Sequence, residues 1–194
     1  MKARNRKGKR AVPGYDPCVT GGTAGDPARD SGLPIRRSAR ILLADRQDRI
    51  LLFRFTDQNS DAPGGVWWGT PGGGIEEGES LPAAAARELF EETGVRVAPE
   101  AFARIVGRSQ GPALFFGERR WYLNEFYFLR TDGFELDDSG WGEVERVSIV
   151  EHRWWTVGEL AATTEIVHPP GLPRLLPDLL GGRPPAEPID IGWA

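Results

Sequence analysis

The stretch PGGGIEEGESLPAAAARELFEETGVRV, residues 71–97, constrains the fold of this chain more than any other. It places a glycine-rich turn directly before a segment of good helix formers. Ser80 is a suitable N-cap, Pro82 falls in the first turn, where its missing N–H costs little, and Gly94 suits the position just after a helix. The sequence therefore predicts a helix from Leu81 to Thr93.

The last turns of this helix carry three carboxylates, Glu88, Glu91 and Glu92. The C-terminal end is the negative pole of a helix, where each carboxylate costs about 0.3–1 kcal/mol. Arg87 can neutralise only part of this charge. One interpretation is a solvated acidic face, which the helix alone favours. The other is a bound divalent cation, for which Mg²⁺ is the usual choice where carboxylates, water and phosphate share the ligation.

The spacing around the helix favours the cation. Residues 73–95 run from a glycine through five residues to a glutamate, then through seven residues to the sequence RELFEETGV. This pattern resembles the complete signature of the Nudix hydrolases, G-x5-E-x7-R-E-U-x-E-E-x-G-U with U apolar, and every fixed position matches. The resemblance is strong over residues 71–97 and extends more loosely over residues 35–181.

The resemblance implies a fold and a reaction. The expected fold is an α/β/α sandwich around a mixed β-sheet, of the α/β (α+β) class. The expected function is metal-dependent hydrolysis of the pyrophosphate bond of a nucleoside diphosphate linked to another moiety. The implied cofactor is Mg²⁺, with Mn²⁺ as a substitute, and the partner is a small nucleoside diphosphate derivative. The alternative is a Nudix-fold module that binds a nucleotide without cleaving it, although an intact signature favours the enzyme.

The resemblance also implies roles for individual residues. The expected metal ligands are carboxylates and one backbone carbonyl: Glu88, Glu91, Glu92, Glu79 as an outer ligand, and the carbonyl of Gly72. Arg87 would hold the carboxylates by ion pairing, which completes a catalytic set of Arg87, Glu88, Glu91 and Glu92. Gly73 and Gly74 would let the backbone approach the phosphates, which a Cβ would obstruct.

The sequence leaves two questions open: which glutamate is the general base, and what role the two adjacent tryptophans have. Glu88 is the first candidate for the general base, while some relatives recruit a later glutamate. The later candidates are Glu143, Glu145 and Glu151, of which Glu151 is best placed by sequence, although each is individually more often surface charge. Trp67 and Trp68 stand in a polar loop before the signature, where one of them could line the substrate pocket and stack on a base. The alternative for these rings is core packing.

Glycine, proline and polar residues mark the expected boundaries between segments in the rest of the chain. Residues 1–33 lack apolar periodicity and are expected to be a disordered basic tail. The Nudix domain is expected over residues 34–181, beginning with a hairpin of strands at 39–43 and 49–55. Further strands are expected after the helix, and a last helix is expected to end at Gly181. Residues 182–194 are expected to be a proline-rich extended tail.

Composition excludes several classes of protein. The formal net charge is −4, and residues 11–194 alone carry 18 basic and 28 acidic residues, or −10. Such an acidic body argues against a stable nucleic-acid complex. No apolar run reaches the roughly 20 residues that span a bilayer. The single cysteine, Cys18, excludes an internal disulfide and suits a cytoplasmic location. A homodimer is compatible with the sequence.

Overall fold

The computed structural model of the protein describes residues 27–193. The predicted basic tail falls mostly on residues 1–26, outside this range. Where the prediction and the structure overlap they differ, because α1 (Pro27–Asp30) forms one helical turn. Its Ala28 is only 2% exposed.

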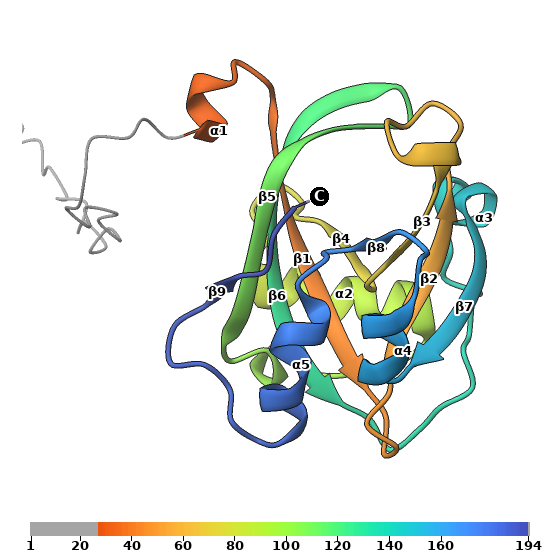
Figure 1. Cartoon of the computed structure of the whole chain (residues 1–194), viewed down its shortest axis with the longest axis vertical. Coiled ribbons are helices and arrows are strands. Elements are labelled where there is room, and N and C mark those ends of the chain that lie inside the picture. The colour runs from red at the N-terminus through yellow and green to blue at the C-terminus, as the bar shows by residue number, and fades with distance from the viewer. Residues whose placement is uncertain (1–26, 194) are drawn as a thin grey trace, which may run out of the picture.

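Nine strands form one mixed sheet (Figure 1). Along the main path their order is β8-β3-β2-β1-β6-β5-β9, with β4 paired to β1 and β7 paired to β2. The pairs β1–β6, β3–β8 and β5–β9 are parallel and the remaining pairs are antiparallel. The strands are β1 (Ile35–Ala44), β2 (Ile50–Thr56), β3 (Val66–Gly69), β4 (Gly72–Gly74), β5 (Ile105–Phe115), β6 (Glu118–Arg130), β7 (Ile149–Trp155), β8 (Val167–His168) and β9 (Ile189–Asp190).

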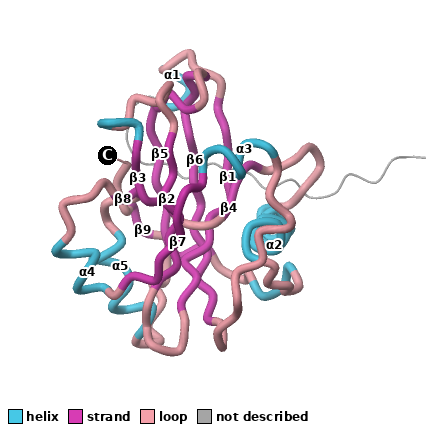
Figure 2. Tube along the Cα trace, turned by 90° about the vertical axis from the view of Figure 1, so that its right-hand side faces the viewer, coloured by secondary structure: helices cyan, strands magenta, loops and turns pink. Residues whose placement is uncertain are grey.

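Helices cover both faces of the sheet, which confirms the predicted α/β/α sandwich. Figure 2 shows α2 (Leu81–Thr93) on one side of the strands, with α4 (Val157–Ala162) and α5 (Leu172–Leu180) on the other. A short helix, α3 (Glu143–Ser148), leads into β7. Two 3₁₀ turns, Pro63–Gly65 and Pro99–Ala101, complete the helical elements of the described residues.

Alternation along β1 builds two cores, one on each face of the sheet. Ala39, Ile41 and Leu43 pack toward α2, with Leu89 of that helix in the same cluster. Leu42 and Ala44 belong to the opposite cluster, together with the leucines of α5. All of these side chains except that of Leu180, which is partly buried, are fully or almost fully buried. The predicted apolar runs are therefore confirmed as sheet residues that are covered on both sides.

The predicted β1–β2 hairpin is confirmed, but its two strands pair only near the turn, at Ala44 and Ile50. Beyond that point β4 takes the place beside β1, with Arg40 opposite Gly72. Gly72 has a φ of 119°, and a Cβ on it would stand 2.2 Å from the Ala39 carbonyl oxygen. Glycine is therefore required for this close pairing, which anchors the glycine-rich turn to the middle of the sheet.

Residues 189–193 pack against the sheet, and we refer to them as the C-terminal strap. Its first two residues form β9, which runs parallel to β5. Ile191 is 1% exposed and joins the core that contains α5. Within residues 27–193, no helix is long and apolar enough to cross a membrane.

Candidate active site

The helix that follows the glycine-rich turn begins and ends where the sequence predicts. The side chain of Ser80 accepts a hydrogen bond from the Ala83 backbone N–H at 3.3 Å. At the other end, Gly94 adopts the left-handed conformation with a φ of 76°, and its N–H donates to the Phe90 carbonyl. Local capping thus determines α2 at both ends, and with it the direction in which its last turns present their glutamates.

Arg87 connects the glycine-rich turn to the carboxylates of the helix. Its guanidinium donates to Glu79 through two nitrogens, each at 3.0 Å, and to the Gly74 carbonyl at 2.9 Å. The same group reaches Glu88 at 2.8 Å and Glu91 at 3.0 Å. The hydrogen bonds with Glu79 raise the pKa of Arg87 and lower the pKa of that glutamate. Arg87 therefore has the position that its expected ion-pairing role requires.

Glu92 is the most deeply buried of the three helix glutamates, at 5% exposure. Its carboxylate accepts a hydrogen bond from the Gly72 N–H at 2.6 Å. Burial and the neighbouring charge of Glu88 raise the pKa of Glu92 to about 8, against the opposing effect of that hydrogen bond. Burial likewise raises the pKa of Glu88, with Arg87 opposing. Two carboxylates that resist ionisation therefore stand one helical turn apart.

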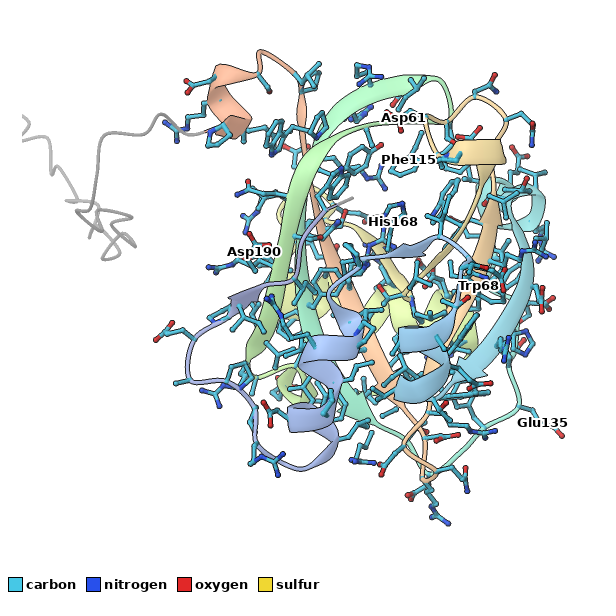
Figure 3. The ribbon with its side chains drawn as sticks, viewed as in Figure 1. Asp61, Trp68, Phe115, Glu135, His168 and Asp190 are labelled. Atoms are coloured by element: carbon cyan, nitrogen blue, oxygen red, sulfur yellow. The ribbon has the colours of Figure 1, made fainter. Side chains whose placement is uncertain are left out.

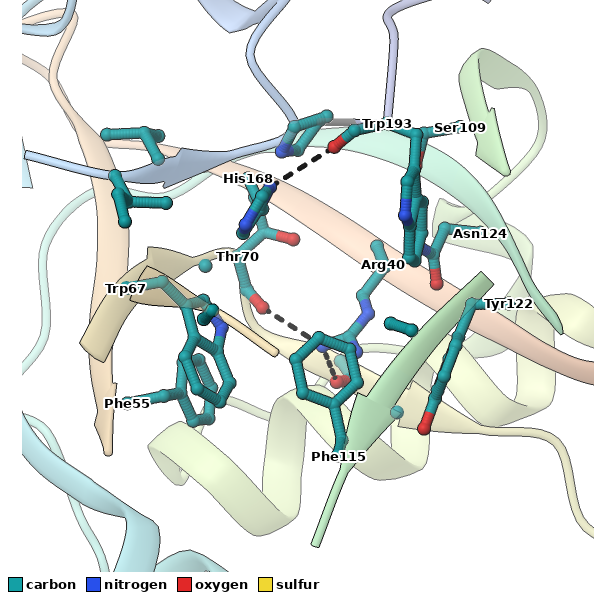
Figure 4. Close-up of a pocket in the computed structure, with 18 of the residues that line it drawn as sticks. Arg40, Phe55, Trp67, Thr70, Ser109, Phe115, Tyr122, Asn124, His168 and Trp193 are labelled. Atoms are coloured by element: carbon teal, nitrogen blue, oxygen red, sulfur yellow. Dashed lines mark hydrogen bonds between the residues drawn. The ribbon is translucent and has the colours of Figure 1, made fainter. Parts of the chain in front are cut away.

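Arg40 lies beside this pair, and the sequence-based search missed it. Its guanidinium is buried and donates to the carbonyls of Thr70, at 3.3 Å, and Gly72 (Figure 4). Burial lowers the pKa of Arg40, although the charges of Glu92 and Glu88 oppose that shift. The signal that could have found it is an arginine inside the otherwise apolar strand SARILLA. Because Arg40 binds the Gly72 carbonyl, a metal ion at that oxygen would have to share it.

The carboxylates of the site can supply only part of the ligand shell of a hard cation. Within residues 27–193, no three acidic, histidine or cysteine side chains stand together closely enough to hold a metal ion as they are placed. Glu79 and Glu91 turn toward Arg87, while Glu88 and Glu92 line a pocket. The buried Glu92 and the partly buried Glu88 both have raised pKa values, and they fit a divalent cation, which would offset both their repulsion and their desolvation. Water and phosphate oxygens would complete the shell.

The pocket has a volume of about 1060 Å³ and an aromatic wall. Trp67 lines it and stacks on Phe55 with 5.6 Å between ring centroids, while Phe115 lies 5.0 Å from Trp67. Figure 4 shows Trp67 and Phe55 on one side of Arg40 and Tyr122 on the other, and Figure 3 shows His168 between β3 and the β5–β6 pair. The sequence-based search also missed several polar residues of this pocket, among them Arg36, Ser109, Arg120, Asn124 and His168.

The tryptophan pair stands in β3 and not in a loop, so the predicted loop is wrong at these two residues. Their rings have separate environments because successive side chains of a strand point to opposite faces. Trp67 faces the pocket. Trp68 packs in the core edge-on to Trp155, at 5.1 Å, and its indole N–H donates to Glu165 at 2.8 Å. The structure therefore brings Trp67, and not Trp68, to the candidate site.

The three later candidates for the base, Glu143, Glu145 and Glu151, also lie in different environments. Glu145 of α3 lines the pocket, and its charge contributes to the raised pKa of Glu92. Glu151 is exposed on β7 and pairs with Arg54 at 3.4 Å. Neither Glu151 nor Glu143 is among the described residues that line the pocket. The loop before α3 contacts the end of α2, where the Trp141 indole N–H donates to the Glu92 carbonyl at 2.9 Å. Spacing along the chain cannot reveal this contact.

Comparison with known proteins agrees with this site. The model of the NUDIX domain family matches residues 34–178. An RNA pyrophosphohydrolase from Novosphingobium aromaticivorans is 45% identical over 65 residues, which cover 34% of this chain and 38% of the relative. An RNA pyrophosphohydrolase from Roseobacter denitrificans is 32% identical over 122 residues, which cover 55% of this chain and 71% of the relative.

Solved structures share the fold at low sequence identity. The MutT protein from Methanosarcina mazei Go1 superposes with a TM-score of 0.54 at 18% identity, over 77% of this chain and 96% of that one. The NUDIX domain of Shewanella oneidensis NrtR complexed with ADP ribose also reaches 0.54, at 19% identity, over 86% and 94%. The signature, the sandwich fold and the family match over residues 34–178 agree, and the chain belongs to the Nudix hydrolase family.

Proposed function

We propose that the protein is a metal-dependent hydrolase that cleaves the pyrophosphate bond of a nucleoside diphosphate linked to another moiety. The observation that carries this proposal is that the carboxylates of Glu88 and Glu92 line one pocket beside the glycine-rich turn, where Glu92 is buried and accepts a hydrogen bond from the Gly72 N–H. The names of the relatives, RNA pyrophosphohydrolases, support a phosphoanhydride of a nucleotide as the substrate.

Each part of the site has a proposed role. Glu88 and Glu92 would hold the divalent cation, with Glu91 and the outer ligand Glu79 turning from Arg87 when it binds. A bound cation supplies charge neutralisation at the diphosphate and lowers the pKa of a coordinated water. Glu88 is the first candidate to accept the proton of the attacking water.

The remaining residues bind and orient the substrate. A Cβ at Gly73 would lie 2.6 Å from the Glu88 carboxylate oxygens, so glycine leaves room for that carboxylate next to the turn. Gly74 lies against Arg36, whose guanidinium also lines the pocket. The arginines Arg36, Arg40 and Arg120 provide positive charge for phosphate oxygens. Trp67 offers a ring face to the group at the other end of the substrate.

A substrate panel tests the proposal. It contains nucleoside triphosphates, ADP-ribose, dinucleoside polyphosphates and 5′-triphosphorylated RNA, each with Mg²⁺ or with EDTA. The proposal predicts Mg²⁺-dependent release of a nucleoside monophosphate, pyrophosphate or phosphate from at least one member. Tight binding of a panel member without any cleavage would instead identify a nucleotide-binding module, a reading for which the solved NUDIX domain with bound ADP ribose is a structural parallel.

A further inference from the structure

One wall of the pocket comes from a part of the chain outside the family match. The C-terminal strap lies beyond residue 178, where the match to the NUDIX domain ends. Pairing with β5 holds it in place, as the Ile191 N–H donates to the Arg108 carbonyl at 2.9 Å. The Ile191 carbonyl in turn accepts from the Gly171 N–H at 2.9 Å. The strap is therefore an integral part of the site.

Trp193 of the strap lines the pocket and is held on several sides. Its indole N–H donates to the Pro112 carbonyl at 3.1 Å, and its ring stacks on Tyr122 at 5.9 Å between centroids. Its backbone carbonyl accepts a hydrogen bond from His168 Nδ1 at 3.1 Å. A Cβ at Gly111 would lie 2.4 Å from the indole, so glycine allows the ring to lie against β5. The result is a rigid aromatic surface at this wall.

Asn124 places an unsatisfied polar atom close to that surface. The residue lines the pocket at only 9% exposure, and its amide nitrogen donates to Ser109 Oγ at 3.3 Å. Its Oδ1 is buried without a hydrogen-bond partner in the described part of the chain. Leaving a buried acceptor unpaired is unfavourable, so a ligand that donates a hydrogen bond there would be stabilised.

The strand register relates Asn124 to the glycine-rich turn. Asn124 of β6 pairs with Ser38 of β1, which pairs with Gly74 of β4 on its other side. Neighbouring strands lie about 4.8 Å apart, so the backbones of Asn124 and Gly74 are about 10 Å apart. The same pocket therefore carries carboxylates and arginines at one end and an aromatic wall with a free acceptor at the other.

We propose that Trp193 and Asn124 form a purine-binding subsite, in which the base stacks on the aromatic wall and an exocyclic amine donates to Asn124 Oδ1. The inference rests on the proposed function and deepens it, because it names purine nucleotides as the substrate class. A purine is favoured over a pyrimidine because its two fused rings cover more of the wall, and stacking strength follows the apolar area that is buried. The diphosphate then extends toward Glu88 and Glu92.

Calorimetric titration with two non-hydrolysable probes in Mg²⁺ tests the stacking. α,β-Methylene-ADP carries a base and methylenediphosphonate does not. Trp193→Ala is expected to weaken binding of the nucleotide about 10-fold, within the range of base stacking on aromatic side chains, and to leave the diphosphonate unaffected. Trp193→Phe should restore most of the affinity. Trp121→Ala is the matched control, since Trp121 precedes Tyr122 on β6 and is outside the described pocket lining.

The outcomes separate this subsite from the proposed function. Equal weakening of both probes by Trp193→Ala, or equal effects of Trp193→Ala and Trp121→Ala, would overturn the subsite. So would wild-type protein that binds the diphosphonate as tightly as the nucleotide, while the proposed function would stand. Failure of both probes to bind would count against the proposed function as well.

A second titration tests the amine. The probes are the α,β-methylene diphosphates of adenosine and purine riboside, and of guanosine and inosine, so that each pair differs by one exocyclic amine. In the wild type, loss of the amine should weaken binding about 3- to 10-fold in at least one pair. In Asn124→Leu, or in Asn124→Ser should the leucine variant not fold, the two members should bind within twofold. No penalty in the wild type, or the same penalty in the variant, would overturn the contact.

Discussion

At the scale of single residues, the site depends on one unfavourable arrangement. Glu92 is buried at the negative end of a helix, next to Glu88, and the Gly72 N–H at 2.6 Å compensates only in part. A raised folded-state pKa means that the folded protein binds a proton more tightly than the unfolded chain does. Stability from this group is then fully present below its unfolded pKa of 4.5 and is lost as pH rises through about 8.

The first prediction concerns the pH dependence of the metal-free protein. Its free energy of unfolding should fall between pH 4.5 and 8, by roughly 4 kcal/mol, because Glu92 must ionise while buried. Glu92→Gln removes this titration, so its stability should vary less over that range and should equal or exceed that of the wild type at pH 8. Urea denaturation in EDTA at several pH values measures both. If the free energy of unfolding varied with pH in the same way in the wild type and in Glu92→Gln, the assignment of this titration to Glu92 would be contradicted.

The second prediction compares two later glutamates as alternatives to Glu88 as the base. Glu145 lines the pocket that holds Glu88 and Glu92, whereas Glu151 is exposed and paired with Arg54. With Glu88 as the base, Glu145→Gln and Glu151→Gln should each leave kcat within about threefold, and a fall of about 10²-fold in Glu145→Gln alone would assign the base to Glu145 instead. Steady-state rates on the best panel substrate, at saturating Mg²⁺, distinguish them. Equal effects of the two substitutions would remove Glu145 from the candidates and leave Glu88.

At the scale of elements, the features that depend on contacts between residues close in sequence were predicted correctly. The features that depend on contacts between distant residues were not. The bounds of α2 were predicted correctly because Ser80 and Gly94 cap it through contacts within four residues. The separation of β1 from β2 was not predicted, since it depends on Gly72 meeting Ala39, far away in sequence. Which of Trp67 and Trp68 in β3 faces the pocket could not be predicted either, because that also depends on residues far away in sequence.

The third prediction tests the contact between the turn and the helix. Gly73→Ala would place a Cβ 2.6 Å from the Glu88 carboxylate, which is the movable end of a side chain. The carboxylate should be displaced, so kcat should fall about 10-fold or more while the melting temperature changes little. The control is Gly158→Ala in α4, where a Cβ meets nothing within 4 Å and activity should be unchanged. Full activity of the Gly73 variant would mean that Glu88 works from another position.

At the scale of the whole molecule, the site draws on the entire described chain. Residues from β1, α2 and α3 meet the C-terminal strap in one pocket. Sequence reasoning named Glu88 and Glu92, which line the pocket and lie within one contiguous signature. It missed Arg40, Asn124 and Trp193, because their place in the pocket depends on strand order and on the pairing of β9 with β5.

The fourth prediction measures how strongly the strap is held. Ile191 is 1% exposed in the core, so Ile191→Ala should lower the free energy of unfolding by about 2–4 kcal/mol. Ile35→Ala makes the same chemical change at a side chain that is 46% exposed and should cost less than about 1 kcal/mol. Denaturant unfolding of both variants gives the comparison. A small and equal loss would show that the strap contributes little to the fold.

The most direct test of the account is the Mg²⁺ dependence of turnover in the wild type, Glu92→Gln and Glu151→Gln. The proposed function implies that a bound divalent cation offsets the unfavourable placement of the Glu88 and Glu92 carboxylates. It predicts Mg²⁺-dependent turnover in the wild type, a kcat about 10²-fold lower in Glu92→Gln with a requirement for more Mg²⁺, and no change in Glu151→Gln. Full Mg²⁺-dependent turnover by Glu92→Gln would contradict it, since Glu92 would then not be a ligand.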